Sequence, residues 1–104
     1  MLDYRTLRPV FRALASTTRL LFIDALQGSG AELRLDDFCE LAPLRTSTVV
    51  HHLRVLEAAG LITSEKVGTT RFYRFRPEGL MQAAKRLHHL AAPAIRPYPD
   101  AGLR

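Results

Sequence analysis

The sequence predicts one mainly helical α+β domain, with four helices before a single β-hairpin and a fifth helix after it. Two observations lead to this expectation. Apolar residues recur every three or four positions through most of residues 7–59 and again after Pro77, which is the period of an amphipathic helix. Between these segments, residues 61–75 are rich in β-branched and aromatic residues, which favour strands. A length of 104 residues, with 47% apolar and 24% charged residues, fits one globular domain.

The first two helices are marked by apolar periodicity and by the residues at their ends. The first helix has apolar residues at helical spacing, namely Leu7, Val10, Phe11 and Leu14. Ser16 is the expected N-cap of the second helix, because its hydroxyl can accept a hydrogen bond from the first turn. Residues 28–30, Gly-Ser-Gly, should end that helix, since glycine readily adopts the left-handed conformation found at helix ends.

A short strand and two more helices are expected before the hairpin. Residues 32–35 alternate between polar and apolar, which predicts a brief strand. Asp36 or Asp37 is expected to cap a short third helix, which ends before Pro43 because proline cannot continue it. The fourth helix is predicted over residues 46–59, with Gly60 in the position that closes a helix.

The remaining residues predict a hairpin, a helix and a tail. Residues 61–66 and 70–75 form the two strands, and residues 67–69 form the turn between them. A last helix begins near Pro77, and its apolar residues are Leu80, Ala84, Leu87 and Ala91. Prolines then become frequent. We therefore expect a folded domain over residues 1–92 and a flexible, proline-rich tail over residues 93–104.

The order of these elements predicts a winged helix-turn-helix. In this arrangement two helices are joined by a tight turn, the second helix enters the major groove of DNA, and the hairpin flanks it. The fourth helix has the two faces that this role requires. Its core face consists of Val49, Leu53 and Leu56. Its outer stripe consists of Ser47, Val50, His51 and Arg54, with Thr46 at the N-terminal end. A net charge of +5 also favours a polyanionic partner.

Three segments carry a resemblance to a known family. The first is ALASTTRL at residues 13–20, the second is STVVHHLRVLEAAGLI at residues 47–62, and the third is Gly68 followed by FYRF at residues 72–75. In this combination the chain resembles regulators of the ArsR (arsenic-repressor) family. The resemblance implies a repressor that binds a palindromic operator in double-stranded DNA as a homodimer. It also implies release from DNA by an effector, which the sequence does not identify.

The chain departs from the family pattern at three positions near the expected DNA contacts. Relatives often begin this helix with a serine where Arg45 stands, so the cap could shift to Thr46. Val50 replaces a common polar residue and could pack on a thymine methyl group. Thr69 replaces an arginine, so Lys66 or Arg71 could take over its phosphate contact. The predicted DNA-binding residues are Thr46, Ser47, Val50, His51, Arg54, Lys66 and Arg71.

The resemblance also implies that the first and last helices form the dimer interface. One small domain cannot easily cover the apolar stripes of both helices, so part of this surface should contact a second copy of the chain. The predicted interface residues are Leu7, Val10, Phe11, Leu80, Leu87 and Leu90.

The metal sites of the family are not expected here, and no cofactor is predicted. Arg34 and Asp36 stand where metal sensors place paired cysteines. The positions that match a second site, on the last helix, hold Pro77, Gly79, Leu90 and Pro93. An unusual site that pairs one histidine of His88-His89 with an acid such as Glu78 is the alternative. The lone Cys39 is interpreted as a core or interface residue.

Two other classes of function were compared with DNA binding. A winged helix used only for protein–protein contact would not need basic residues such as Arg54, Lys66 and Arg71 on the recognition side. An enzyme is not expected, because we find no phosphate-binding glycine loop, metal-binding His/Glu motif or nucleophile elbow. The sequence lacks a signal-peptide pattern at its N-terminus and any apolar run near ~18 residues, so we expect a cytoplasmic protein that does not enter membranes.

Overall fold

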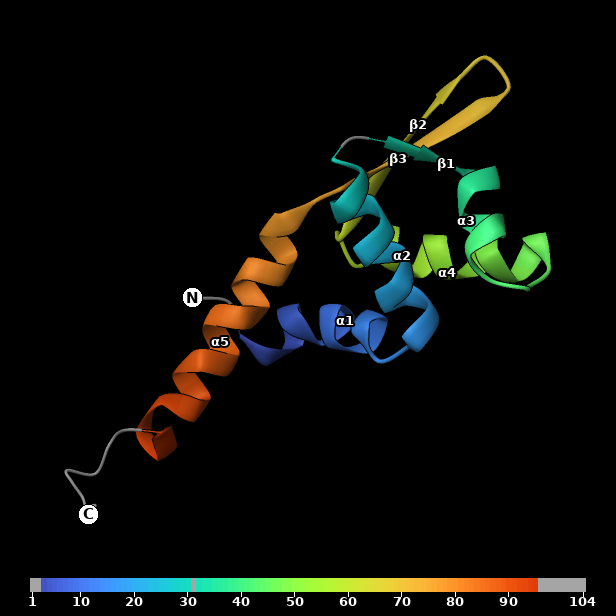
Figure 1. Cartoon of the computed structure of the whole chain (residues 1–104). Helices are drawn as coiled ribbons and strands as arrows, with labels where there is room; N and C mark the ends of the chain where they lie inside the picture. The colour runs from blue at the N-terminus through green and yellow to red at the C-terminus, as the bar shows by residue number, and fades with distance from the viewer. Residues whose placement is uncertain (1–2, 31, 96–104) are drawn as a thin grey trace.

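The computed structural model describes residues 3–30 and 32–95. Five helices and a three-stranded sheet follow one another as α1 (Tyr4–Leu14), α2 (Thr17–Ser29), β1 (Glu32–Arg34), α3 (Leu35–Leu41), α4 (Thr46–Ala58), β2 (Ile62–Val67), β3 (Thr70–Phe75) and α5 (Pro77–Ile95). This order confirms the predicted mainly helical α+β class. Figure 1 shows α2, α3 and α4 gathered beside the sheet, with the β2–β3 hairpin projecting at one end and α5 at the other.

The sheet is antiparallel, with the strand order β1-β3-β2. Val67 pairs with Thr70, so the hairpin turn consists of Gly68 and Thr69 alone, one residue shorter than the sequence suggested. Gly68 has a φ of +64°, which is the left-handed conformation that a two-residue hairpin turn needs at its first position. The strand β1 pairs with β3, and Glu32 accepts a hydrogen bond from Arg74 Nε at 2.6 Å across that pair.

Side chains and glycines set the helix ends, in one case differently from expectation. Ser16 Oγ accepts from Arg19 N at 3.3 Å, which confirms it as the N-cap of α2, and Gly30 ends that helix with a φ of +70°. The third helix begins earlier than predicted, at Leu35. Asp37 lies in its first turn and accepts from the backbone N of Arg34 at 2.8 Å, so an aspartate does stabilise this terminus but not as the N-cap residue.

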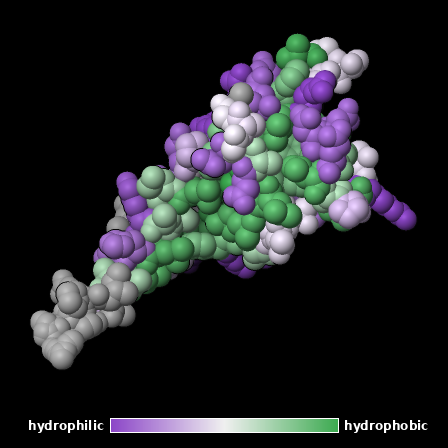
Figure 2. Space-filling view, viewed as in Figure 1, coloured by the Kyte–Doolittle hydropathy of each residue, from purple (hydrophilic) through white to green (hydrophobic). Residues whose placement is uncertain are grey.

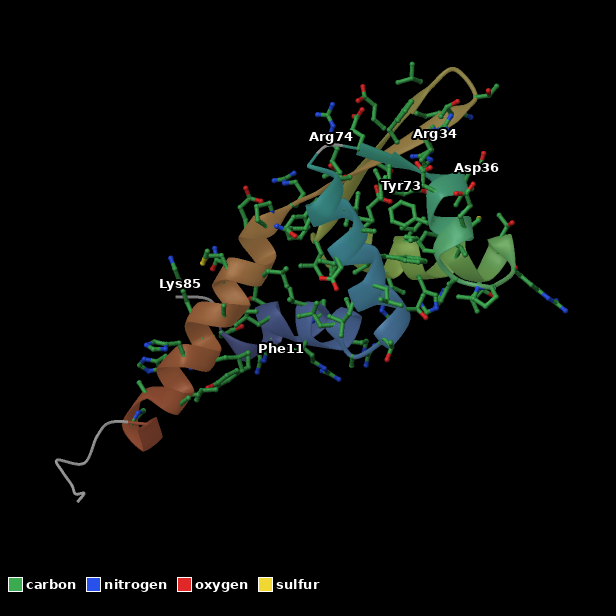
Figure 3. The ribbon with its side chains drawn as sticks, viewed as in Figure 1. Phe11, Arg34, Asp36, Tyr73, Arg74 and Lys85 are labelled. Carbon is green, nitrogen blue, oxygen red and sulfur yellow. The ribbon has the colours of Figure 1, made fainter. Side chains whose placement is uncertain are left out.

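One continuous core joins all five helices to the sheet. Phe22 of α2 and Phe38 of α3 are fully buried with ring centroids 4.9 Å apart, and Tyr73 packs edge-on against Phe38. Figure 3 shows Tyr73 pointing inward from β3, while its neighbour Arg74 points to the outside. Burial raises the pKa of the Tyr73 hydroxyl. The α4 face formed by Val49, Leu53 and Leu56 is also buried, as the sequence predicted.

The last helix projects from the core and carries uncovered apolar side chains. Within the described residues α5 packs against α1 alone among the helices and strands, and the molecule measures 60 × 26 × 23 Å. Leu80 and Ala83 face the core, whereas the large apolar side chains exposed on α5 are Met81, Leu87 and Leu90. In Figure 2 hydrophobic side chains gather along the side of α5 and over α2.

The expected tail boundary falls inside α5. The helix passes through Pro93 and ends at Ile95, three residues beyond the predicted end of the domain. A proline in the last turn removes only one intrahelical hydrogen bond, which the rest of the helix tolerates. Residues 96–104, which make up most of the predicted tail, lie outside the described residues.

Candidate nucleic-acid interface

The start of α4 presents free backbone donors and hydroxyls to solvent. Residues 42–45 connect α3 to α4, and Arg45 occupies the N-cap position, so the suggested shift of the cap to Thr46 is corrected. Arg45 O accepts from Thr48 N and Val49 N, at 2.9 and 3.0 Å. In the described structure the amides of Thr46 and Ser47 have no such acceptor, and both side chains are exposed. Free N–H groups at a helix N-terminus are well suited to an anionic partner.

The outer stripe of α4 is largely exposed to solvent. Ser47, His51 and Arg54 are exposed, and Val50 is half-buried, at the edge of the stripe. The opposite side is fixed in the core, because Val49, Leu53 and Leu56 are at most 1% exposed. One face of α4 is therefore held rigidly while the other offers a hydroxyl, an imidazole, a guanidinium and a methyl-bearing side chain.

The hairpin adds a pair of positive charges on the side of the sheet that faces the core and α4. Lys66 and Arg71 are directly opposite each other in the β2–β3 register, so their side chains lie on the same face as Tyr73. Both are exposed. Like charges at directly opposed positions repel, and the repulsion is relieved when an anion lies between them. The pair Lys66 and Arg71 is therefore more favourable when an anionic partner is bound than when the protein is free in solution.

A hydrogen-bonded chain ties the hairpin to α4. Arg71 Nη1 donates to Ser64 Oγ at 2.9 Å, and Ser64 Oγ donates to Glu57 Oε2 at 2.8 Å. Glu57 belongs to α4, so the hairpin and the helix are linked through polar side chains at the exposed end of the core. Arg71 is consequently anchored by one of its nitrogens, and its remaining donors are directed from a fixed position.

Arg19 supplies a second anchor for α4, which the sequence analysis did not identify. Its Nε donates to Ala13 O at 2.7 Å and its Nη2 donates to Arg12 O at 3.3 Å, so it satisfies carbonyls at the end of α1. Its Nη1 lies 3.0 Å from His52 Nδ1. Arginine can only donate, so His52 Nδ1 is the acceptor and the ring is held in the tautomer protonated at Nε2.

His52 is thus a packing residue, unlike its exposed neighbour His51. Its ring meets Phe22 edge-on, with centroids 6.3 Å apart. Burial lowers the pKa of His52 from its usual value, and the positive charges of Arg19 and His51 act in the same direction. The neutral imidazole is therefore the form that fits this position.

The remaining candidate residues do not assemble into a metal centre in the described part of the chain. Within residues 3–30 and 32–95, no three side chains of His, Cys, Asp or Glu come together in a way that could hold a metal ion. Cys39 is half-buried, and its Sγ lies 4.0 Å from Thr46 Oγ1 at the start of α4. Two acidic residues of this region have structural partners, because Glu32 accepts a hydrogen bond from Arg74 and Asp37 accepts one from the backbone at the start of α3.

The predicted dimer residues fall into two groups. Leu7 and Val10 are 1% and 5% exposed in the single chain, because they pack into its own core, so they have almost no surface left for a second copy. Phe11 and Leu80 are half-buried, whereas Leu87 and Leu90 are 52% and 53% exposed. Among the predicted interface residues, the uncovered apolar surface therefore lies mainly on the outer half of α5. None of the described helices is long and apolar enough to cross a lipid bilayer.

Comparison with known proteins identifies the family. Residues 16–64 match the model of bacterial regulatory proteins of the arsR family. An uncharacterized HTH-type transcriptional regulator of Methanocaldococcus jannaschii is 32% identical over 73 residues, which cover 70% of this chain and 81% of the relative. The structure of an ArsR-like transcriptional regulator from Rhodococcus sp. RHA1 has a TM-score of 0.79 and 30% identity, and the match covers 89% of this chain and 84% of that one.

A third comparison concerns the fold alone. The homodimeric winged helix-turn-helix DNA-binding domain of a possible ArsR-family regulator from Mycobacterium bovis has a TM-score of 0.63 and 22% identity, and the match covers 88% of this chain and 93% of that domain. The elements, their order, the Methanocaldococcus jannaschii relative and the Rhodococcus structure agree with the resemblance seen in the sequence. The chain is a transcriptional regulator of the winged helix-turn-helix type and belongs to the ArsR family of bacterial regulatory proteins.

Proposed function

We propose that this regulator binds a palindromic DNA operator as a homodimer and represses transcription, and that an effector releases it. The observation that carries the proposal is the continuous outer surface formed by α4 and the hairpin. It combines the free amides at the start of α4, the exposed Ser47, His51 and Arg54, and the opposed charges of Lys66 and Arg71. Such a surface offers hydrogen-bond donors to base edges and positive charge to phosphates.

The residues divide between the two kinds of contact. Thr46, Ser47, Val50 and His51 lie toward the N-terminal half of α4, the part of a recognition helix that contacts bases. Val50 would contribute by packing its methyl groups on a thymine methyl. Arg54 lies farther along the helix, and Lys66 and Arg71 lie on the hairpin, so these three would bind phosphates. Arg71 would do so with the donors that Ser64 leaves free.

Two copies would associate through α5 and the adjoining surface of α1. Leu87 and Leu90 are half exposed on a helix that projects from the core, and Tyr4 of α1, whose ring lies under Arg86 of α5, adds to this surface. The Mycobacterium bovis domain of similar fold is a homodimer, which supports the dimeric state. A two-fold dimer repeats the recognition helix symmetrically, and this is why the operator should be an inverted repeat. No catalytic activity is part of the proposal.

The proposal is tested by measuring binding to DNA selected for high affinity and to a scrambled duplex, by fluorescence anisotropy at several salt concentrations. Ser47→Ala and His51→Ala should reduce the preference for the selected duplex by about 1–3 kcal/mol if each loses a base contact. Arg54→Ala and Lys66→Ala should weaken binding to both duplexes alike and flatten the salt dependence.

Lys85→Ala is the matched control, because Lys85 is exposed on α5 and Figure 3 shows it on the side of that helix away from α1. It should leave both affinities close to those of the wild type. If none of the four substitutions on α4 and the hairpin affects DNA binding more than this control, the proposed interface is wrong. If the wild type binds no duplex at all, a protein–protein role takes the place of DNA binding.

A further inference from the structure

Three arginines line a hollow between α1 and α4 that the proposed interface does not include. The hollow has a volume of about 480 Å³ and is lined by Arg5, Arg8, Pro9, Arg12, Val55, Ala58 and Ala59. Arg5, Arg8 and Arg12 follow an i, i+3, i+7 pattern, so they form one stripe along α1. This stripe lies roughly half a turn around the helix from the core residues Leu7 and Val10.

The positive charge of this stripe is not neutralised by nearby carboxylates. Among the described residues, no aspartate or glutamate lines the hollow. The ion pairs of the described structure instead join Arg74 to Glu32 and Arg76 to Glu78, far from α1 in the sequence. Asp3, the acid that precedes α1, accepts from Thr6 N and Thr6 Oγ1. Three guanidinium groups thus share one surface with apolar side chains beneath them, which favours an anionic partner.

The hollow continues the DNA-facing stripe of α4. Ser47, His51, Arg54 and Ala58 are spaced i, i+4, i+7 and i+11, so they lie along one side of that helix. Ala58 is the C-terminal member of this stripe, and it also lines the hollow. Its side chain is a single methyl group, so a partner that follows α4 from its N-terminal end can approach the arginines of α1 without obstruction.

We propose that Arg5, Arg8 and Arg12 bind phosphates of the operator, on the strand that passes the C-terminal end of α4. This inference rests on the proposed function and extends its interface from α4 and the hairpin to α1. The dimensions agree with it, because Arg5 and Arg12 are about 10 Å apart along a helix that rises about 1.5 Å per residue. A DNA strand carries one phosphate per about 3.4 Å of axis and winds around that axis, so a stripe of this length is long enough to meet more than one phosphate. Arginine is also the side chain that pairs with phosphate in a bidentate manner.

The test compares Arg8→Gln with Lys85→Gln in the full chain. Each substitution removes one positive charge from an exposed helical position and keeps a long polar side chain. Each lost phosphate contact reduces the slope of log K against log salt by about 0.9, and a homodimer contains Arg8 twice. Arg8→Gln should therefore flatten the slope by about 1.8. When the salt concentration rises fourfold, the affinity of Arg8→Gln for DNA should then fall about 12-fold less than that of the wild type. Lys85→Gln should change the slope by less than about 0.5, since it loses no phosphate contact.

Ethylation interference gives the position of the contact as well as its strength. Some phosphates outside the segments that α4 and the hairpin contact should block binding of the wild type when they are ethylated. Ethylation of these same phosphates should no longer weaken binding of Arg8→Gln. The inference is overturned if Arg8→Gln keeps the wild-type slope and the wild-type interference pattern. If Arg54→Ala flattens the slope in the same series, the proposed function survives that result; if neither does, the proposed function fails as well.

A small anion in the hollow is the other outcome that would overturn the inference. Calorimetric titration with decanoate, which joins a carboxylate to an apolar chain, measures this directly. Saturable binding that Arg8→Gln abolishes, together with an unchanged salt slope on DNA, would assign the hollow to an organic anion instead of to operator phosphates. We expect no saturable binding of decanoate.

Discussion

Arg19 should be one of the most important polar residues for stability, although it lies near the surface. It joins the end of α1, the start of α2 and the middle of α4 through Ala13 O, Arg12 O and His52 Nδ1. We predict the effect of Arg19→Met, which keeps an unbranched side chain with good helix propensity and removes the guanidinium. The substitution leaves two carbonyls and one imidazole nitrogen without this donor.

The magnitude follows from the three contacts. A hydrogen bond from a charged donor contributes about 1.5–3 kcal/mol, and a typical neutral one about 0.5–1.5 kcal/mol. Arg19 is half-buried, so water can partly replace it, and the low ends of these ranges apply. We assign about 1.5 kcal/mol to the short bond to Ala13 O. The other two contacts are assigned about 0.5 kcal/mol each, because Arg12 O also accepts from Ala15 N and because water can reach the half-buried His52. Arg19→Met should therefore lower the free energy of unfolding by about 2.5 kcal/mol.

Urea unfolding followed by circular dichroism at pH 7.5 measures this change. Both proteins are compared at one protomer concentration, because association adds to the apparent stability. Arg8→Met is the control: it removes an exposed guanidinium from α1 and should change the free energy of unfolding by no more than about 0.5 kcal/mol. If Arg19→Met costs no more than this control, the guanidinium does not hold α4 in place and the anchoring argument is refuted.

The structure also predicts a pH effect and the results of two further substitutions. The pKa of His52 is lowered from its usual value of 6.5 in the folded chain, so below this pH the unfolded chain binds a proton at His52 more readily than the folded chain does. The free energy of unfolding is therefore unaffected by this group above pH 6.5 and decreases as the pH falls below it. In urea titrations from pH 7.5 to 5, His52→Gln should lose less stability than the wild type; equal losses would exclude the effect. Gly60→Ala should lower the free energy of unfolding by about 1–2 kcal/mol, because the φ of +77° strains an L-residue; an unchanged urea midpoint would contradict this. Leu87→Glu should shift the dimer toward monomer in sedimentation velocity, whereas Lys85→Glu should not, and a Leu87→Glu protein that stays dimeric would remove α5 from the interface.

The order of the elements and the faces of α4 could be predicted because both depend on local sequence. Val49, Leu53 and Leu56 are spaced as one helical face, and Gly60 closes the helix with the left-handed φ that its position required. Helix starts were less predictable. Asp36 and Asp37 are both good capping residues, and only the structure shows that Asp37 acts from inside the first turn.

Contacts between residues distant in sequence could not be predicted from one chain. Arg19 and His52 are 33 positions apart, and nothing in their local sequence indicates that they meet. The apolar stripe of α1 shows the same limit. Its period indicates burial, but it does not say whether the covering surface belongs to the same chain, as it does for Leu7 and Val10, or to a second copy. The arginines of α1 are spaced i, i+3, i+7 in the sequence, but their place beside Ala58 depends on how α1 and α4 pack.

The central claim, that two symmetrically placed copies of α4 bind DNA, is tested most directly by selecting duplexes from a random library with the wild-type protein. The proposal predicts enrichment of an inverted repeat, with half-site centres about one helical turn apart or somewhat more. The same selection with Ser47→Ala should yield a weaker preference at corresponding positions of both half-sites. No enrichment, or enrichment of a single asymmetric site by a protein that sediments as a dimer, would contradict the account.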